Sequence, residues 1–241
     1  MLDVQKPHYF VNPAFPVSEG EPKRVIDPAT LADVGARADV TAAEIETVLD
    51  KVNAAQALWK DVDAKSRAKV LHTLANRIEA TDFTECAILM SREMGKPYPE
   101  AIGEIANCAP IFRYYAEMAR DEAGKVAGTT QKGSLQFATY EPLGVSVHIM
   151  PFNFPILLMC WTVAASLAAG NGCVVKPAED TPLTTLYLAR LVKELGFPDG
   201  VVNVVPGLGE VTGAALSANS RLARMSFTGS PEVGRLVAEA C

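Results

Sequence analysis

The chain has 241 residues, which is enough for one large domain or two modest ones. Its 22 lysines and arginines stand against 28 aspartates and glutamates, so the net charge is −6. Without a basic run, this balance argues against binding to nucleic acid or to an anionic membrane surface. Hydrophobic residues make up 49% of the chain and charged residues 21%, which excludes general disorder and provides for a globular core.

The cysteines and histidines do not predict a metal site or a disulfide framework. The cysteines are odd in number and widely spread, none forms a Cys-x-x-Cys pair, and the three histidines share no metal-ligand spacing. A free cysteine is usually a small buried hydrophobe. We expect this role for all five: Cys86, Cys108, Cys160, Cys173 and Cys241.

Nothing in the sequence predicts a signal peptide or a membrane span. The first ten residues have no apolar core. The longest apolar stretch, residues 156–169, is shorter than the roughly 20 residues that cross a bilayer. These features predict a cytoplasmic protein with no membrane partner.

The first half of the chain predicts strands and then a helical layer. Residues 1–36 carry several Xaa-Pro pairs and predict surface strands and turns. Thr41-Ala-Ala-Glu44 has the form of a capping box, and apolar residues follow at helical spacing. Helical patterns continue over 64–80, 82–94 and about 98–120, so residues 40–122 are expected to form a helical layer.

The second half alternates strands with helices. Residues 134–141 and 145–150 are strand-like and are separated by a Pro-Leu-Gly turn. Further strands are predicted at 173–175, 201–205 and 224–227, with helices at 155–169, 182–195, 210–218 and from Pro231; Thr181 is expected to cap the second of these helices. This alternation predicts an α/β fold, a Rossmann-like parallel sheet with helices on both faces. Such sheets bind ligands at the carboxyl ends of their strands.

Four motifs follow predicted strands, and the first is Pro151-Phe-Asn-Phe-Pro155. The two prolines restrict the turn, so Asn153 is expected to have a fixed geometry. An oriented amide is a good donor to a developing oxyanion. The alternative is an ordinary turn asparagine before a helix.

The second motif is Lys176-Pro-Ala-Glu179. A carboxylate at a strand end can accept both hydroxyls of a ribose, and the lysine can reach a ribose or a phosphate. The alternative is a surface ion pair that contributes little to stability.

The third and fourth motifs are rich in glycine. Gly207-Leu-Gly209-Glu-Val-Thr-Gly213 is similar to a dinucleotide fingerprint but has three residues, not two, between its last glycines; the alternative is a loop and a helix start. In Phe227-Thr-Gly-Ser230, Ser230 is a predicted N-cap and Pro231 suits the first helical position. That helix N-terminus favours a phosphate, Gly229 permits close approach, and the alternative is an ordinary capped helix.

Together the motifs resemble the NAD(P)-dependent aldehyde dehydrogenases over nearly the whole chain. Residues 151–155 are similar to the family's Pro-Trp-Asn-Phe-Pro segment, with Phe152 in place of the commoner Trp. Other segments that resemble the family are Asn12-Pro13, Asp27-Pro-Ala-Thr30, Glu93-Met-Gly-Lys-Pro97, Tyr114-Tyr115, Gly170-Asn171, Lys176–Pro182, and Phe227–Ser230 with Gly234.

The resemblance implies a mechanism and a role for particular residues. In this family a Cys thiolate attacks the aldehyde, hydride passes to NAD, and a Glu activates the water that hydrolyses the thioester. The resemblance implies that Asn153 is the oxyanion donor, that Lys176 and Glu179 bind the adenosine ribose, and that Ser230 contacts the pyrophosphate. It implies a cofactor path lined by Ile149, Met150, Phe152, Gly209, Gly213, Phe227, Gly229 and Val233.

The resemblance also implies the choice of cofactor and the aldehyde tunnel. The Glu179 carboxylate favours NAD over NADP because it repels a 2′-phosphate at short range. Phe154, Leu158 and Trp161 match positions that line the aldehyde tunnel, although core packing is the alternative.

Two family motifs are absent from these residues: the general-base Glu in its Leu-Gly-Gly context and the nucleophilic Cys. Cys241 ends the last predicted helix and is in the wrong place to be that nucleophile. The chain is therefore expected to be the amino-terminal portion of an NAD-dependent aldehyde dehydrogenase. The alternatives are a truncated relative that binds NAD or a partner without catalysis, and an acylating relative that transfers its product to coenzyme A.

We divide the chain into three regions on this basis. Residues 1–133 are expected to form the strands and helical layer, residues 134–148 a β-hairpin oligomerisation arm with the first sheet strand, and residues 149–241 an incomplete NAD-binding core. The strands 134–141 and 145–150 are expected to form the arm that pairs with another subunit. The resemblance implies a homodimer or a homotetramer.

Overall fold

The computed structural model describes residues 22–121, 124–129, 131–193 and 195–241, so the Asn12-Pro13 motif and the rest of the first 21 residues lie outside the described residues. The elements of the amino-terminal part are β1 (Lys23–Ile26), β2 (Asp33–Arg37), α1 (Ala42–Trp59), α2 (Ala64–Ala80), α3 (Thr84–Met94), α4 (Tyr98–Ala106), α5 (Cys108–Asp121), β3 (Lys125–Ala127) and β4 (Gln136–Ala138). Those of the carboxyl-terminal part are β5 (Val145–Ile149), α6 (Leu157–Ala168), β6 (Gly172–Lys176), α7 (Pro182–Lys193), β7 (Val202–Val204), η1 (Gly209–Gly213, a π-helical turn), α8 (Ala214–Ser217), β8 (Arg224–Phe227) and α9 (Pro231–Ala240).

A four-stranded parallel sheet forms the centre of the carboxyl-terminal part. The strand order is β7-β6-β5-β8, and every neighbouring pair is parallel. Helices connect the strands, as a parallel sheet requires. The predicted α/β fold is therefore confirmed.

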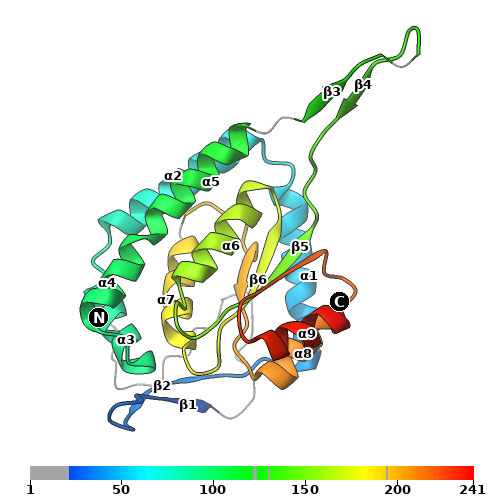
Figure 1. Cartoon of the computed structure of the whole chain (residues 1–241). Helices are drawn as coiled ribbons and strands as arrows, with labels where there is room; N and C mark the ends of the chain where they lie inside the picture. Colours follow the sequence, from blue (N-terminus) through cyan, green and yellow to red (C-terminus); the bar gives the residue numbers. More distant parts are fainter. Residues whose placement is uncertain (1–21, 122–123, 130, 194) are drawn as a thin grey trace.

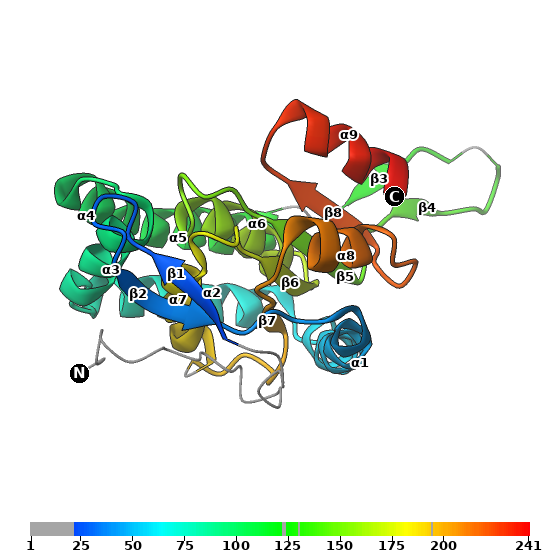
Figure 2. The ribbon, with the colours of Figure 1, turned by 90° about the horizontal axis from the view of Figure 1, so that it is seen from below.

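Helices cover both faces of this sheet (Figures 1 and 2). On one face, apolar residues of α1 and Leu216 of α8 pack against Val145 and Val147 of β5. On the other face, α6 and α7 pack on the sheet and α2 and α5 form a further layer outside them. β5 and β6, at the centre of the sheet, are therefore buried on both faces, whereas β8 at its edge is only partly buried.

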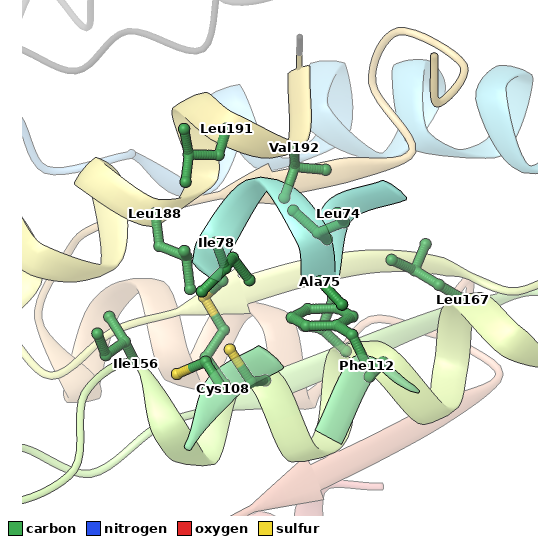
Figure 3. Close-up of a cluster of buried hydrophobic side chains, with 14 of the residues drawn as sticks. Leu74, Ala75, Ile78, Cys108, Phe112, Ile156, Leu167, Leu188, Leu191 and Val192 are labelled. Carbon is green, nitrogen blue, oxygen red and sulfur yellow. The ribbon is translucent and has the colours of Figure 1, made fainter. Parts of the chain in front are cut away.

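The larger core lies where α2, α5, α6 and α7 meet (Figure 3). Phe112 of α5 and Leu74 of α2 are almost fully buried there, next to Leu188 of α7 and Leu167 of α6. Burial of side chains of this size contributes roughly 1.5–3 kcal/mol each. This core fixes α6, and therefore the chain segment that leads into it.

The helical layer confirms most of the predicted helices and corrects one. The predicted capping box is present, because the Thr41 side chain accepts from the Glu44 backbone and the Glu44 side chain accepts from the Thr41 backbone. The single helix expected over 98–120 is two helices, α4 and α5. Pro110 explains the break, since a proline has no N–H to donate and its ring clashes with the carbonyl four residues earlier, that of Ala106.

The arm is a β-hairpin, but its strands differ from the prediction. β4 pairs with β3 in antiparallel register, with Val126 opposite Phe137. β5 is the first strand of the central sheet, as predicted, and lies between β6 and β8; it does not pair with β4 in the arm. The hairpin projects away from the body of the molecule (Figure 1), and all its strand residues are exposed. The sequence pattern missed β3, which has three residues and no buried face.

Cysteine burial is confirmed at four positions and is wrong at the fifth. Cys86, Cys108, Cys160 and Cys173 are buried and free, whereas Cys241 at the end of α9 is exposed. Burial raises the pKa of the Cys173 thiol to about 12, so this group stays protonated. Within the described ranges, no helix combines the length and apolar character that crossing a membrane demands.

Candidate functional site

Three of the predicted motifs meet at the carboxyl ends of adjacent strands. Ile149, the last residue of β5, lies opposite Lys176 of β6 on one side and Phe227 of β8 on the other. Two hydrogen bonds continue this pairing beyond the strands, from Met150 N to the Lys176 carbonyl (2.9 Å) and from Thr228 N to the Ile149 carbonyl (3.1 Å). The sheet therefore brings the segments after β5, β6 and β8 to one edge.

Lys176 and Glu179 form an ion pair that is not a surface pair. The Lys176 Nζ lies 3.3 Å from a Glu179 carboxylate oxygen and donates to the Pro177 carbonyl at 3.1 Å. The Lys176 side chain is 3% exposed, whereas that of Glu179 is 37% exposed. The lysine thus lies under the carboxylate, which remains open to a ligand, and the surface-pair alternative is wrong.

The charges of this pair are set by burial and by each other. Burial lowers the pKa of the Lys176 ammonium, and Glu179 opposes that shift. Burial alone would raise the pKa of Glu179, but its own backbone N–H, the Lys176 charge and Arg37 together lower the pKa of this carboxyl. Glu179 is therefore an anion at neutral pH and a hydrogen-bond acceptor for hydroxyl groups.

Arg37 of β2 is a residue of this site that the sequence pattern missed. Its side chain is nearly buried, pairs with Asp39 (2.7 Å) and donates to the Glu179 backbone carbonyl at 2.9 Å. Arg37 lies 142 positions before Glu179, so no local pattern connects them. This contact fixes the turn that carries Glu179.

The glycine-rich segment after β7 lies against the same pair. A Cβ placed on Gly213 would lie 3.5 Å from the Lys176 side chain, and one on Gly209 would lie 4.0 Å from a Glu179 oxygen. The segment forms the π-helical turn η1 and then α8, so the loop-and-helix alternative describes its backbone correctly. A π-helical turn has hydrogen bonds between residues five positions apart, and such turns often occur at functional sites.

The last helix begins as the sequence predicts. Ser230 is the N-cap of α9, its hydroxyl oxygen accepts from Val233 N at 3.3 Å, and Pro231 follows at the first position. The hydroxyl hydrogen of Ser230 can still be donated to a ligand. A Cβ on Gly229 would lie 2.5 Å from the Phe227 ring, so a larger residue here would displace that ring. The exposed N-terminus of α9 is a suitable place for an anion.

Asn153 lies in the exposed turn between β5 and α6. Phe152 beside it is 60% exposed, whereas Met150 is 3% exposed and packs in the larger core. The Asn153 backbone carbonyl accepts from the Nζ of Lys96 at 2.7 Å. The sequence did not predict that Lys96 and its partner Glu104 lie next to Asn153.

Phe154, Leu158 and Trp161 lie on one side of the start of α6. Phe154 is 39% exposed and Trp161 54% exposed, so core packing does not account for these two side chains in this chain. Leu158 is partly buried and packs against the larger core. The exposed rings of Phe154 and Trp161 form an apolar surface on the segment that also carries Asn153.

The site combines groups that suit a ligand with ribose and phosphate parts. It has a carboxylate over a buried cation, a glycine-bearing turn, and a serine-capped helix N-terminus. Two nearby hydrogen-bond acceptors on a carboxylate suit vicinal hydroxyls, and a helix N-terminus suits a phosphate. Among the residues that the structure describes, no cluster of three or more potential ligands could hold a metal ion.

Comparison with known proteins gives matches over almost the whole chain. The sequence profile described as "Aldehyde dehydrogenase family" matches residues 16–241. Retinaldehyde dehydrogenase 3 of Mus musculus is 40% identical over 99% of this chain and 47% of its own length. The chain thus spans about half the length of the curated relatives that it matches.

Solved structures agree with this match. The structure of PnpE, a protein of Pseudomonas sp. WBC-3, in complex with nicotinamide adenine dinucleotide has a TM-score of 0.87 and 36% identity, over 91% of this chain and 45% of that one. An NADP-dependent enzyme of E. coli has a TM-score of 0.88 and 35% identity, over 92% of this chain and 46% of that one.

Proposed function

The chain belongs to the aldehyde dehydrogenase family, and from this membership we propose that it is the cofactor-binding portion of an enzyme that oxidises an aldehyde to a carboxylic acid with NAD. The observation that carries the proposal is the arrangement at the sheet edge. The Lys176–Glu179 pair and the Ser230-capped helix lie after strands that flank the same central strand, β5. This arrangement suits a dinucleotide whose ribose and pyrophosphate lie along one edge.

We assign the contacts to the cofactor as follows. Glu179 accepts the hydroxyls of the adenosine ribose, with Lys176 beneath it, and Ser230 with the N-terminus of α9 binds the pyrophosphate. The path between them is assigned to Ile149, Met150, Phe152, Gly209, Gly213, Phe227, Gly229 and Val233. When bound, NAD accepts a hydride from the substrate. NAD is preferred to NADP because Glu179 is an anion at the position of a 2′-phosphate.

We assign to Asn153 the role of hydrogen-bond donor to the oxyanion. An aldehyde carbonyl that is attacked by a nucleophile develops negative charge on its oxygen, and an amide N–H held in place stabilises that charge. Phe154, Leu158 and Trp161 are assigned to the entrance for an aldehyde with an apolar body. The nucleophilic Cys and the general-base Glu belong, in this proposal, to a further part of the whole protein.

The proposal is tested by the reaction of the whole protein. We expect NADH to form when an aldehyde and NAD are added, and Asn153→Ala to lower kcat by roughly 10²–10³-fold, the effect of removing one oxyanion donor. The matched control is Asn107→Ala, which alters an amide on the exposed end of α4. Turnover of Asn153→Ala near that of the wild type would exclude the oxyanion role.

The intact mass separates this proposal from its alternatives. A mass near 25.7 kDa, together with NAD binding and no turnover, would support a truncated binding protein. A mass about twice as large, with aldehyde-dependent NADH formation, would support the complete enzyme. Dependence of that reaction on coenzyme A would support the acylating alternative.

The assembly and the cellular location complete the proposal. We assign the β3–β4 hairpin to contact with another subunit, in a homodimer or a homotetramer, because it exposes the large apolar side chains of Val126 and Phe137 and lies away from the body. A cytoplasmic location stays a prediction from the sequence.

A further inference from the structure

Lys96 and Glu104 form an ion pair inside the protein. The side chain of Lys96 is 6% exposed and that of Glu104 is 0% exposed, and the ammonium donates directly to the carboxylate. Lys96 follows Gly95, whose φ of +81° ends α3 in the left-handed region that favours glycine, and Glu104 lies on α4. The pair therefore belongs to the helical layer and not to the sheet.

Glu104 caps a helix from another part of the chain. Its second oxygen accepts from Ile156 N and from Leu157 N, both at 3.1 Å. These are among the first N–H groups of α6, which has no side-chain cap of its own and no acidic residue in its first turn. A carboxylate at this place satisfies two otherwise unpaired donors and interacts favourably with the helix dipole.

Lys96 holds the turn that precedes the same helix. Its Nζ donates to the Asn153 backbone carbonyl at 2.7 Å and lies 3.9 Å from the centre of the Phe154 ring. Together the two side chains contact residues 153, 154, 156 and 157. The side chains of residues 152–154 are exposed, so burial does not fix this part of the turn, and the contacts of Lys96 restrain it; at the end of the turn the Thr185 hydroxyl also donates to the Pro155 carbonyl at 3.2 Å.

We propose that Lys96 and Glu104 are positioning residues for Asn153. This inference rests on the proposed function, in which Asn153 donates to the oxyanion. Such a donor is effective when it is already in place before the charge develops, and a displacement of about 1 Å can lower the rate by 10²-fold. Pro151 and Pro155 restrict the backbone at the two ends of the turn, and the ion pair fixes its middle.

The test uses the whole active protein with the variants Lys96→Met and Glu104→Gln. We expect kcat to fall roughly tenfold to a hundredfold, while the Kd for NAD stays within about twofold, because Glu179 and Ser230, to which the ribose and pyrophosphate contacts are assigned, lie on other segments, and Phe152 is the one residue of this turn assigned to the cofactor path. Glu100→Gln, on the exposed side of the same helix, is the matched control and is expected to behave as the wild type. Circular dichroism verifies that each variant is folded.

A double-mutant cycle with Asn153→Ala distinguishes positioning from general structural support. If the pair acts through Asn153, Lys96→Met has little further effect on kcat in the Asn153→Ala protein. The inference is wrong if Lys96→Met lowers kcat by the same factor in the wild-type and Asn153→Ala backgrounds. It is also wrong if the single variants Lys96→Met and Glu104→Gln have the kcat of the wild type.

Hydrogen exchange provides a readout that does not require activity. The amides of Ile156 and Leu157 are expected to exchange at least about tenfold faster in Glu104→Gln than in Glu100→Gln, since their acceptor has lost its charge. Unchanged exchange would contradict the inference. An inactive wild type would instead contradict the proposed function, so the two failures are distinct.

Discussion

At the scale of single residues, Glu179 combines exposure with a fixed charge. Its carboxyl is 37% exposed, its pKa is lowered, and its backbone is bonded to Arg37. A carboxylate with these properties discriminates between two ligands that differ by one phosphate, because the repulsion acts at short range. The charge of Glu179, more than its shape, is therefore expected to set the preference for the cofactor.

Glu179→Ser tests this expectation. We expect the ratio of kcat/KM with NADP to that with NAD to rise about tenfold or more, since about 1.4 kcal/mol of lost repulsion corresponds to tenfold. Asp180→Ser removes the adjacent exposed acid and is the control. If both variants keep the wild-type ratio, Glu179 does not contact the adenosine ribose.

Residues that act across long stretches of chain could not be predicted from the sequence. The capping box of Thr41 and the N-cap Ser230 were predicted because each cap lies within three residues of its partner. Thr181 was expected to cap α7, but its hydroxyl is buried without a partner among the described residues. Glu93, some ninety positions earlier, accepts from Leu183 N and Thr184 N instead.

At the scale of elements, that carboxylate links α3 to the start of α7, in addition to the apolar packing of Leu89 with Leu183. Glu93 is 2% exposed, and burial raises its pKa to about 7 although the hydrogen bonds from Thr184 and Leu183 oppose the shift. The folded state therefore binds a proton that the unfolded chain releases near pH 4.5. Between these values the folded protein holds more protons, so the free energy of unfolding falls as the pH rises.

Glu93→Gln is expected to remove this pH dependence. From about pH 5 to about pH 8, the free energy of unfolding of the wild type should fall by about 2–3 kcal/mol more than that of the variant. Urea unfolding at the two pH values measures the difference. Glu85→Gln, on the exposed side of α3, should follow the wild type; an equal slope in Glu93→Gln would show that Glu93 does not titrate in this range.

The elements that the sequence predicted well are those with a clear period and a clear boundary. Helix α2 and strand β8 have the predicted bounds, and the order of strands and helices after residue 145 is as expected. The failures have local causes. Pro110 divides one expected helix into two, and β3 is a three-residue strand with no buried face, so it leaves no alternating pattern.

At the scale of the whole molecule, the hairpin is the feature that a single chain does not explain. Val126 is 79% exposed and Phe137 67% exposed, and the two residues lie opposite each other in the hairpin. Exposed apolar side chains grouped in this way are typical of an interface. The sequence predicted an arm in this region but not the pairing of β3 with β4, because that pairing depends on which strands belong to the central sheet.

Substitution on the hairpin tests its role in assembly. The pair Val126→Lys and Phe137→Glu places opposite charges across the strands, which preserves the hairpin while it removes the apolar surface. We expect the mass in solution, measured by light scattering, to fall to that of a smaller assembly. Leu58→Lys, which replaces another exposed apolar residue on α1, is the control, and an unchanged mass for the double variant would exclude the hairpin from the interface.

The strand order also has a consequence for how the protein folds during synthesis. β5 can pair with β6 as soon as β6, which begins at Gly172, has been synthesised. The other edge of β5 pairs with β8, which begins only at Arg224. Until then β5, a strand that is buried in the folded protein, has one open edge, and open strand edges promote aggregation. The segment that closes this edge, Phe227 with Gly229 and Ser230, is also the segment that forms the phosphate end of the proposed site. If the proposed function is correct, the step that covers the open edge of β5 also completes the phosphate-binding end of the site, and β8 becomes the new edge of the sheet.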